Sequence, residues 1–328
     1  MNVRVWSVVP IVATSVALLA ACAAPGGANP SAGGAATTLT VVKVDTTSMD
    51  SAAAVWANAP KIELATKAAE KDKPDGPKVT LQAVHDGKNI VFRAEWPDAT
   101  QNDVRRSWLY DGKVFKRDQE QDRFALAFPI GNNAEFATKG CGAACHSNDP
   151  DKEKWHMGVD KKEQSLDMWH WTAAQSGPVD QADDAMITIQ EPITATGRKS
   201  DANDGGGNKN NQDKENKAPA FMSSKGLDAK FIFASEEIPL DISKLQPNTR
   251  IPAYILAPYK GSRGDVAAKA VWANGKWVLV LSRALDTGHD DDTVLIPSKT
   301  IPFAMAVFDN SEDLEHTIVQ NVLTLAWQ

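Results

Sequence analysis

Two stretches of alternating apolar and polar residues that meet at a tight turn constrain the fold of this chain most strongly. Apolar side chains alternate with polar ones through residues 79–83, and again through residues 90–94 after the dipeptide Asp86-Gly87. Successive side chains of a β-strand point to opposite faces, and Asp-Gly is a favoured two-residue hairpin turn. The pattern therefore predicts a β-hairpin that buries one of its faces.

Comparable signals recur along the chain and predict a mainly β protein. Asn274-Gly275 separates two further strand-like runs. Other short β-rich runs cover residues 123–130, 231–233, 251–256, 303–308 and 318–327. Helix is expected only in brief connections, such as residues 163–175. The economical fold class is an antiparallel β-sandwich with short helices.

The N-terminal residues predict export from the cytoplasm. Arg4 precedes an apolar run over residues 8–21, which is short for a membrane span and ends directly before Cys22. Residues 1–21 resemble a bacterial lipoprotein signal peptide, which implies cleavage before Cys22 and lipidation of its thiol. An ordinary secretory signal is the alternative. Because alanine rather than aspartate follows Cys22, a lipid anchor in the outer membrane, facing the periplasm, is favoured.

Two segments are expected to bury too little surface to order themselves. Residues 22–40 are rich in Ala, Gly, Pro, Ser and Thr and are predicted to form a flexible tether. Residues 197–219 contain three consecutive glycines and are predicted to be a long flexible insertion. We interpret residues 41–328 as one domain that carries this insertion.

Composition excludes several classes of function. The hydrophobic share of 42% is enough for a core, and the formal net charge of -7 argues against binding nucleic acid. An acidic surface suits a basic docking partner. The sequence shows no order of residues typical of a catalytic triad, a phosphate loop or a nucleotide-binding fingerprint. We therefore expect a protein without catalytic activity of its own.

The run Cys141-Gly-Ala-Ala-Cys145-His146 indicates a covalently bound haem. In c-type attachment two thiols add to the porphyrin vinyl groups, and the adjoining histidine becomes the proximal iron ligand. The usual motif has two residues between the cysteines, whereas this chain has three, so the match is to a less common variant. A disulfide between Cys141 and Cys145 is the alternative. A zinc site is disfavoured because the sequence lacks paired thiolate knuckles.

The second axial ligand of such an iron is left open between several side chains. His170 lies between two tryptophans, Met222 follows the expected flexible insertion, and Met157 is the nearest methionine after the attachment motif. His156 is a further alternative. Thioether ligation gives a higher reduction potential than imidazole ligation, so the identity of this ligand decides which redox partners are accessible.

Several short motifs occur in an order that resembles one family, the haem-binding subunits typified by the ethylbenzene dehydrogenase gamma subunit. The resemblance covers residues 50–328. It rests on Asp86-Gly87 with Trp96, Asp122-Arg123, the cysteine motif, and residues 167–171, 219–222, 277–283 and 303–310. The resemblance implies a β-sandwich similar to carbohydrate-binding modules, with one haem at the end of the sheets.

The same resemblance implies cofactors and partners. Members of that family pass electrons between the iron-sulfur subunit of a molybdenum enzyme and an outside redox protein. Several members bind haem b without covalent bonds, so the cysteine motif here indicates a c-type member with one covalent haem c. Some members carry both haem types, which leaves a second, non-covalent haem b open.

Arg283 and the tryptophans give the remaining hypotheses. Arg283 ends an apolar strand and is a candidate to neutralise a haem propionate, with an ordinary carboxylate partner as the alternative. Tryptophans also stack on sugars. A carbohydrate-binding lipoprotein with a disulfide between Cys141 and Cys145 is therefore the second function considered.

Overall fold

The predicted β-strands form one large sheet that curls into a sandwich. The computed structural model describes residues 37–70, 72–144, 157–189, 197–215, 217–311 and 315–328. Its largest sheet has 14 strands and includes the order β11-β10-β9-β8-β20-β22-β1-β4-β5-β19-β18. The mainly β fold class predicted from the alternating pattern is confirmed.

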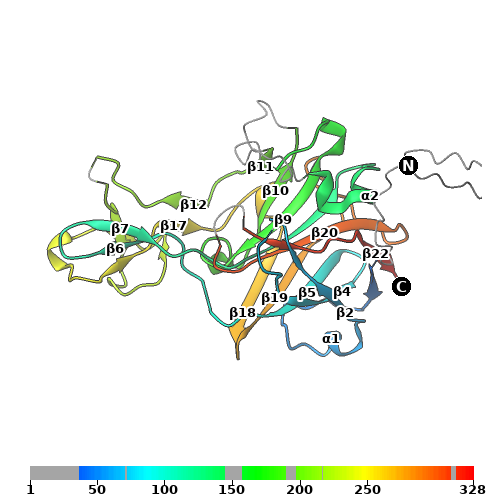
Figure 1. Cartoon of the computed structure of the whole chain (residues 1–328), viewed down its shortest axis with the longest axis horizontal. Helices are drawn as coiled ribbons and strands as arrows, with labels where there is room; N and C mark the ends of the chain where they lie inside the picture. Colours follow the sequence, from blue (N-terminus) through cyan, green and yellow to red (C-terminus); the bar gives the residue numbers. More distant parts are fainter. Residues whose placement is uncertain (1–36, 71, 145–156, 190–196, 216, 312–314) are drawn as a thin grey trace, which may run out of the picture. The chain divides into compact units, whose positions relative to one another are not determined.

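Strand β20 connects the two halves of the sandwich, because it pairs with β22 on one side and with β8 on the other. The first half contains β1 (Thr37–Lys43), β2 (Ile62–Ala65), β4 (Lys78–His85), β5 (Asn89–Pro97), β18 (Ala267–Ala273), β19 (Lys276–Ala284) and β22 (Leu323–Trp327). The second half contains β3 (Lys67–Ala68), β8 (Arg123–Pro129), β9 (Leu166–Thr172), β10 (Asp183–Ile187), β11 (Arg198–Ser200), β20 (Ile301–Phe308) and β21 (Thr317–Ile318). In Figure 1 the strands β9 and β10 lie above β4, β5, β18 and β19.

Most strand pairs of this sheet are antiparallel, as expected, but β1 runs parallel to both of its neighbours. The predicted hairpin is present as β4 and β5, with Leu81 opposite Ala94. Gly87 lies in its turn with φ at 87°, a conformation that glycine adopts at little cost. The second predicted hairpin is β18 and β19, joined by Asn274 and Gly275, which also have positive φ.

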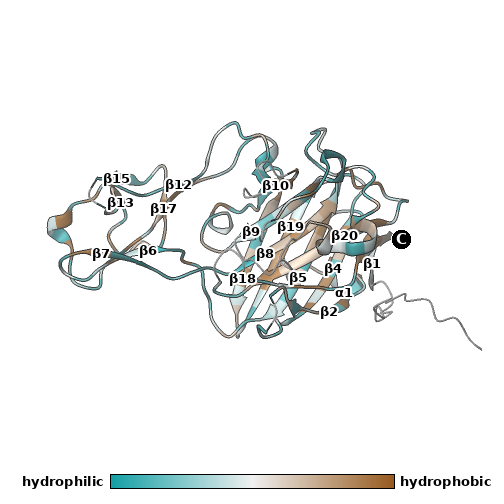
Figure 2. Cartoon of the chain, turned by 45° about the horizontal axis from the view of Figure 1, so that its top comes forward, coloured by the Kyte–Doolittle hydropathy of each residue, from teal (hydrophilic) through white to brown (hydrophobic). Residues whose placement is uncertain are grey.

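Aromatic side chains fill the space between the two halves. Phe92 of β5 packs edge-on against Trp169 of β9, with ring centroids 5.7 Å apart. Trp96 of β5 stacks on Phe124 of β8 at 5.4 Å. Figure 2 shows apolar residues concentrated along β4, β5, β8 and β19. Burial of these large rings is the main favourable contribution to folding.

Residues 163–175 differ from the expected helix. A short 3-10 turn, η3 (Lys162–Gln164), is followed by strand β9. Almost every residue of β9 is buried, so the segment reads as a continuous run rather than as an alternating one. A strand buried on both faces cannot be distinguished from a buried helix by periodicity alone, which explains the error.

A smaller set of strands packs around a core of its own. It contains β6 (Ser107–Tyr110), β7 (Phe115–Asp118), β12 (Gly207–Asn210), β13 (Phe221–Ser223), β14 (Ile232–Phe233), β15 (Glu237–Pro239), β16 (Arg250–Ile251) and β17 (Tyr254–Ala257). β6, β7, β12 and β17 lie together in Figure 1. Trp108, Ile232 and Ile255 are among the buried residues of this core.

The segment 197–219, expected as a flexible insertion, contains β11 and β12 in this structure. Its glycines fit close contacts rather than a free linker. A Cβ on Gly206 would lie 1.7 Å from the carbonyl oxygen of Pro258, and Gly207 has φ at 90° against the ring of Tyr259. The buried Asn211 bonds to the backbone of Phe221 and Pro252. Polar composition misled the prediction because these contacts are made by backbone and amide groups.

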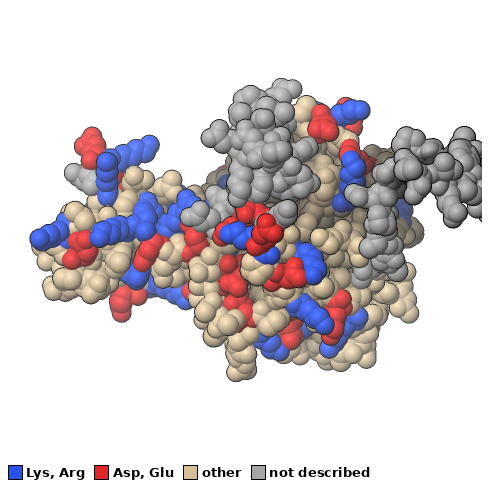
Figure 3. Space-filling model, in the orientation of Figure 1, with Lys and Arg blue, Asp and Glu red and all other residues tan. Residues whose placement is uncertain are grey.

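The remaining elements are short. They are α1 (Val55–Asn58), α2 (Phe136–Lys139), η1 (Gly140–Ala143), η4 (Gly177–Val179), η5 (Ile242–Lys244) and η6 (Ser262–Gly264). Within the described residues, no helix has the length and apolar character needed to cross a membrane. On the face drawn in Figure 3, acidic and basic side chains lie close together. Ion pairs of the described residues include that between Lys139 and Glu135.

Candidate functional site

A buried patch of small residues covers the outer face of the second half of the sandwich. We call it the alanine face, and it consists of Ala125, Ala127, Ala185, Ala304 and Ala306. Side chains alternate along a strand, so the neighbours of these alanines, such as Phe124 and Leu126 of β8, point into the core instead. Met168 of β9 lies in the same outer row, opposite Ala127 and Ala185. Met168 is only 5% exposed.

The first cysteine of the predicted attachment motif lies against this patch. Helix α2 and the turn η1 form a cover that buries Phe136 and Ala144 in the same apolar cluster as the alanine face, and Cys141 packs against that cluster. Cys145 and His146, which complete the motif, and His156 lie outside the described residues. Cys22 and the predicted signal peptide also lie outside them.

Met157 lies next to the cover, between Ala144 and the residue that precedes β11. It packs against the same apolar cluster, and the following residue, Gly158, donates its N–H to the carbonyl oxygen of Ala144 at 3.1 Å. The carbonyl oxygen of Met157 accepts a hydrogen bond from the N–H of Gly197 at 2.6 Å. The structure therefore brings Met157 and Cys141 to one side of the alanine face.

His170 lies one row further along β9, opposite Ala125. Its ring packs 5.8 Å from that of Phe308, which belongs to the same apolar cluster. Burial, and then the positive charge of Arg198, hold the pKa of His170 well below its ordinary value, so the imidazole is neutral. Its Nε2 atom is buried and has no hydrogen-bond partner.

The tautomer of His170 follows from its contact with Arg198. A guanidinium nitrogen of Arg198 lies 3.3 Å from Nδ1 of His170. Guanidinium groups only donate, so Nδ1 accepts this hydrogen bond and the neutral ring carries its proton on Nε2. The buried Nε2–H is therefore a donor that lacks an acceptor, and this arrangement suits an anionic group better than a metal ion.

The other two predicted site residues lie elsewhere. Met222 is in β13, paired with Ile238 of β15 in the smaller set of strands. Arg283 of β19 is 2% exposed and points between the two halves of the sandwich. It has the carboxylate partners that the sequence left as the alternative to a propionate.

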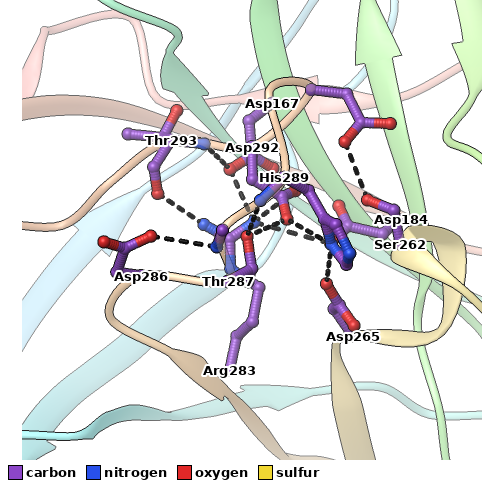
Figure 4. Close-up of polar contacts among 12 residues, drawn as sticks. Asp167, Asp184, Ser262, Asp265, Arg283, Asp286, Thr287, His289, Asp292 and Thr293 are labelled. Carbon is purple, nitrogen blue, oxygen red and sulfur yellow. Dashed lines mark hydrogen bonds and ion pairs between the residues drawn. The ribbon is translucent and has the colours of Figure 1, made fainter.

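Arg283 is the centre of a buried charge cluster, drawn in Figure 4. Its Nη1 atom lies 2.7 Å from Asp167, 2.9 Å from Asp292 and 3.5 Å from Asp184. Its Nη2 atom donates to the carbonyl oxygen of Thr293 at 2.7 Å. The guanidinium also lies 4.7 Å from the centroid of the Trp169 ring. Sequence reasoning did not bring these groups together, because Asp167 and Asp184 are 116 and 99 residues away from Arg283 along the chain.

Burial makes the ionised form of several of these carboxyl groups unfavourable. It raises the pKa of Asp292 to about 6, and it raises the pKa of Asp184 well above its ordinary value. Asp201 lies beside the cluster. Burial, and then the negative charge of Asp291, raise the pKa of Asp201 to about 8. Both carboxylate oxygens of Asp201 are buried without a hydrogen-bond partner.

The fold and this site define a class, a curled β-sandwich with a cysteine-bearing cover over one outer face. A model of the ethylbenzene dehydrogenase family matches residues 53–317. The chain belongs to the ethylbenzene dehydrogenase family, which confirms the resemblance seen in the sequence. No curated protein matches the chain.

Solved structures of low sequence identity are also similar. A proposed carbohydrate-binding protein from Bacteroides uniformis is 12% identical, with a TM-score of 0.40 over 90% of this chain and 100% of that chain. A family 9 carbohydrate-binding module from Caldicellulosiruptor kristjanssonii is 8% identical. Its complex with glucose has a TM-score of 0.36 over 89% of this chain and 96% of the module, and its complex with cellotriose has 0.34 over 89% and 95%.

The raised pKa of Asp201 predicts a pH-dependent stability. Between about pH 4 and pH 8 the folded state keeps a proton that the unfolded state has lost, so the free energy of unfolding falls as the pH rises. One such proton contributes a slope of up to about 1.4 kcal/mol per pH unit. Urea unfolding of Asp201→Asn across this range should show a shallower fall than the wild type.

Asp290→Asn is the matched control, because Asp290 is an exposed aspartate near the same cluster. It should leave the slope unchanged. Equal slopes for Asp201→Asn and the wild type would show that Asp201 is ionised in the folded protein.

Proposed function

We propose that this chain is an exported electron-transfer protein with one covalently bound haem c. The observation that carries the proposal is the position of Cys141, which lies in a cover packed on an apolar, alanine-lined sheet face. A flat apolar macrocycle can replace the contacts between a cover and small side chains. This costs less packing energy than replacing contacts between large interlocked side chains. Family membership supports a role as an electron-transfer subunit.

Residues of the cover, the sheet and the cysteine motif would hold the haem. Cys141 and Cys145 would supply the thioether bonds, and His146 would supply the proximal iron ligand. When bound, the iron accepts and releases one electron. The unpartnered Nε2–H of His170, beside Arg198, would hold a propionate carboxylate. Arg283 is enclosed by aspartates on the opposite face of the sheet and is not assigned to the haem.

We propose that Met168, which the sequence did not suggest as a ligand, would bind the iron together with His146. His146 would supply an imidazole nitrogen and Met168 a thioether sulfur. Met168 is the methionine in the middle of the alanine face, whereas Met157 lies next to the cover. The sequence did contain a signal for Met168. Met168 and His170 are two residues apart, so in a strand they share one face while the two tryptophans take the other.

The partner we propose is a redox protein, with the iron-sulfur subunit of a molybdenum enzyme as the family-based choice. A second, non-covalent haem b is not assigned to any residue. The protein would be exported and anchored through lipid on Cys22 to the outer membrane, facing the periplasm. The acidic net charge of -7 supports docking to a basic surface.

Covalent attachment is tested by the intact mass of the denatured protein. Wild type matured in a host with a haem-attachment apparatus should carry the added mass of one haem. The double variant Cys141→Ala, Cys145→Ala should lose that mass, because both thioether bonds are removed. A wild-type mass without haem would overturn the proposal. A mass lower by two hydrogen atoms than that of the reduced chain would then indicate the disulfide instead.

The axial assignment is tested by the weak near-infrared absorption band of sulfur-ligated ferric haem. Met168→Leu should abolish this band and lower the reduction potential, while the side-chain volume is nearly kept. Met157→Leu and Met222→Leu are the matched controls and should retain the band. A band that persists in Met168→Leu excludes Met168, and a wild type without any band favours His170 as the ligand.

Anchoring is tested by labelling cells with a fatty-acid analogue. The wild-type protein should incorporate the label, and Cys22→Ser should lose it, because lipidation requires that one thiol. Haem attachment should be unchanged in exported Cys22→Ser. Equal labelling of the variant and the wild type would contradict a lipid anchor at Cys22.

A further inference from the structure

Three aspartates from distant parts of the sequence meet at one end of the sandwich. Asp98 directly follows β5, Asp122 directly precedes β8, and Asp309 directly follows β20. One carboxylate oxygen from each lies within 4.8 Å of the others. The three residues flank strands from both halves of the sandwich. They lie outside the alanine face and outside the Arg283 cluster.

No lysine or arginine in the described part of the chain pairs with these three aspartates. Asp122 accepts hydrogen bonds from the backbone N–H groups of Asn102 and Asn310 and from the indole N–H of Trp277, at 2.8–3.0 Å. None of these donors carries a formal charge. The Arg283 cluster is different, because there a guanidinium occupies the space between the converging aspartates.

Asp98 has one carboxylate oxygen without a hydrogen-bond partner. Asp98 is 5% exposed, and one of its carboxylate oxygens accepts a hydrogen bond from the N–H of Thr100 at 3.0 Å. The other oxygen, Oδ2, is buried and has no hydrogen-bond partner. A buried carboxylate oxygen without a donor is unfavourable unless a proton or a cation is bound.

The group can be reached from solvent through a neighbouring pocket. The pocket has a volume of about 680 Å³, and Asp98 and Asp309 line it. Its other acidic lining residues are Glu70, Asp75 and Glu315. Asp309 is exposed, whereas Asp122 is fully buried. An ion entering this pocket would therefore meet the carboxylates of Asp98 and Asp309, and a carboxylate oxygen of Asp122 lies within 4.8 Å of both.

We propose that Asp98, Asp122 and Asp309 bind a calcium ion. The ligand set consists of carboxylate oxygens only, which hard divalent cations prefer. Calcium holds its ligand oxygens at about 2.3–2.6 Å, so oxygens on one ion lie up to about 5 Å apart, in agreement with the observed spacing. The pocket leaves room for water to complete the coordination.

The electrostatic environment agrees with this assignment. Burial raises the pKa of Asp122 to about 7, and the neighbouring charge of Asp98 adds to that rise. Burial, and then the charge of Asp309, raise the pKa of Asp98 as well. The three negative charges are thus unfavourable together, and a divalent cation would stabilise them. This site does not depend on the proposed haem function.

Isothermal titration calorimetry with calcium chloride tests the site on the complete mature protein after treatment with a chelator. We expect saturable binding with one ion at this site. Asp309→Asn should lower the affinity at least about tenfold, because calcium affinity depends on the number of charged ligands. Asp309 is exposed, so the variant should fold and keep the circular dichroism spectrum of the wild type.

Glu315→Gln is the control, since Glu315 lines the same pocket but pairs with Lys73 at 2.6 Å. It should bind calcium with wild-type affinity. Wild-type protein that releases no saturable heat at neutral pH would overturn the proposal. Undiminished affinity in Asp309→Asn would also overturn it, because the ion would then bind at another acidic group.

Discussion

Burial of strand β9 on both faces is the constraint on which the rest of the structure depends. Trp169 and Trp171 pack into the core between the two halves of the sandwich, while Met168 and His170 point to the alanine face. A shift of one residue in register would exchange these two sets of side chains. Correct pairing of β9 with β8 and β10 therefore builds the core and the candidate haem site in one step.

The Arg283 cluster strengthens this arrangement from the inner side. Asp167 of β9 and Asp184 of β10 both reach Arg283 of β19, so the cluster connects the two halves of the sandwich. A buried ion pair adds little net stability compared with apolar packing, but removing one partner costs about 3–5 kcal/mol. We infer that the cluster favours one relative position of the two halves. The indole of Trp169 beneath the guanidinium adds a cation–π contact.

The alanine face and the group formed by Asp98, Asp122 and Asp309 differ in charge. The alanine face is apolar, and its polar neighbour His170 is kept neutral by burial and by Arg198. At the strand ends near Asp98, by contrast, three carboxylates converge, and no lysine or arginine of the described residues forms an ion pair with them. An apolar surface accommodates a macrocycle, whereas converging carboxylates accommodate a small cation. The same strands, β8 and β20, contribute to both features.

The sequence by itself determined the hairpins, the mainly β class and the family, because side-chain alternation, turn dipeptides and motif order are local properties. It also marked Cys141, Cys145 and His146 through their adjacency. It did not determine that residues 163–175 contain a strand, since a strand buried on both faces loses its alternation. Only the tertiary structure placed Met168 beside the cover, enclosed Arg283 in aspartates and brought Asp98, Asp122 and Asp309 together. Such contacts depend on strand pairing between residues that are distant along the chain, and no local pattern encodes that pairing.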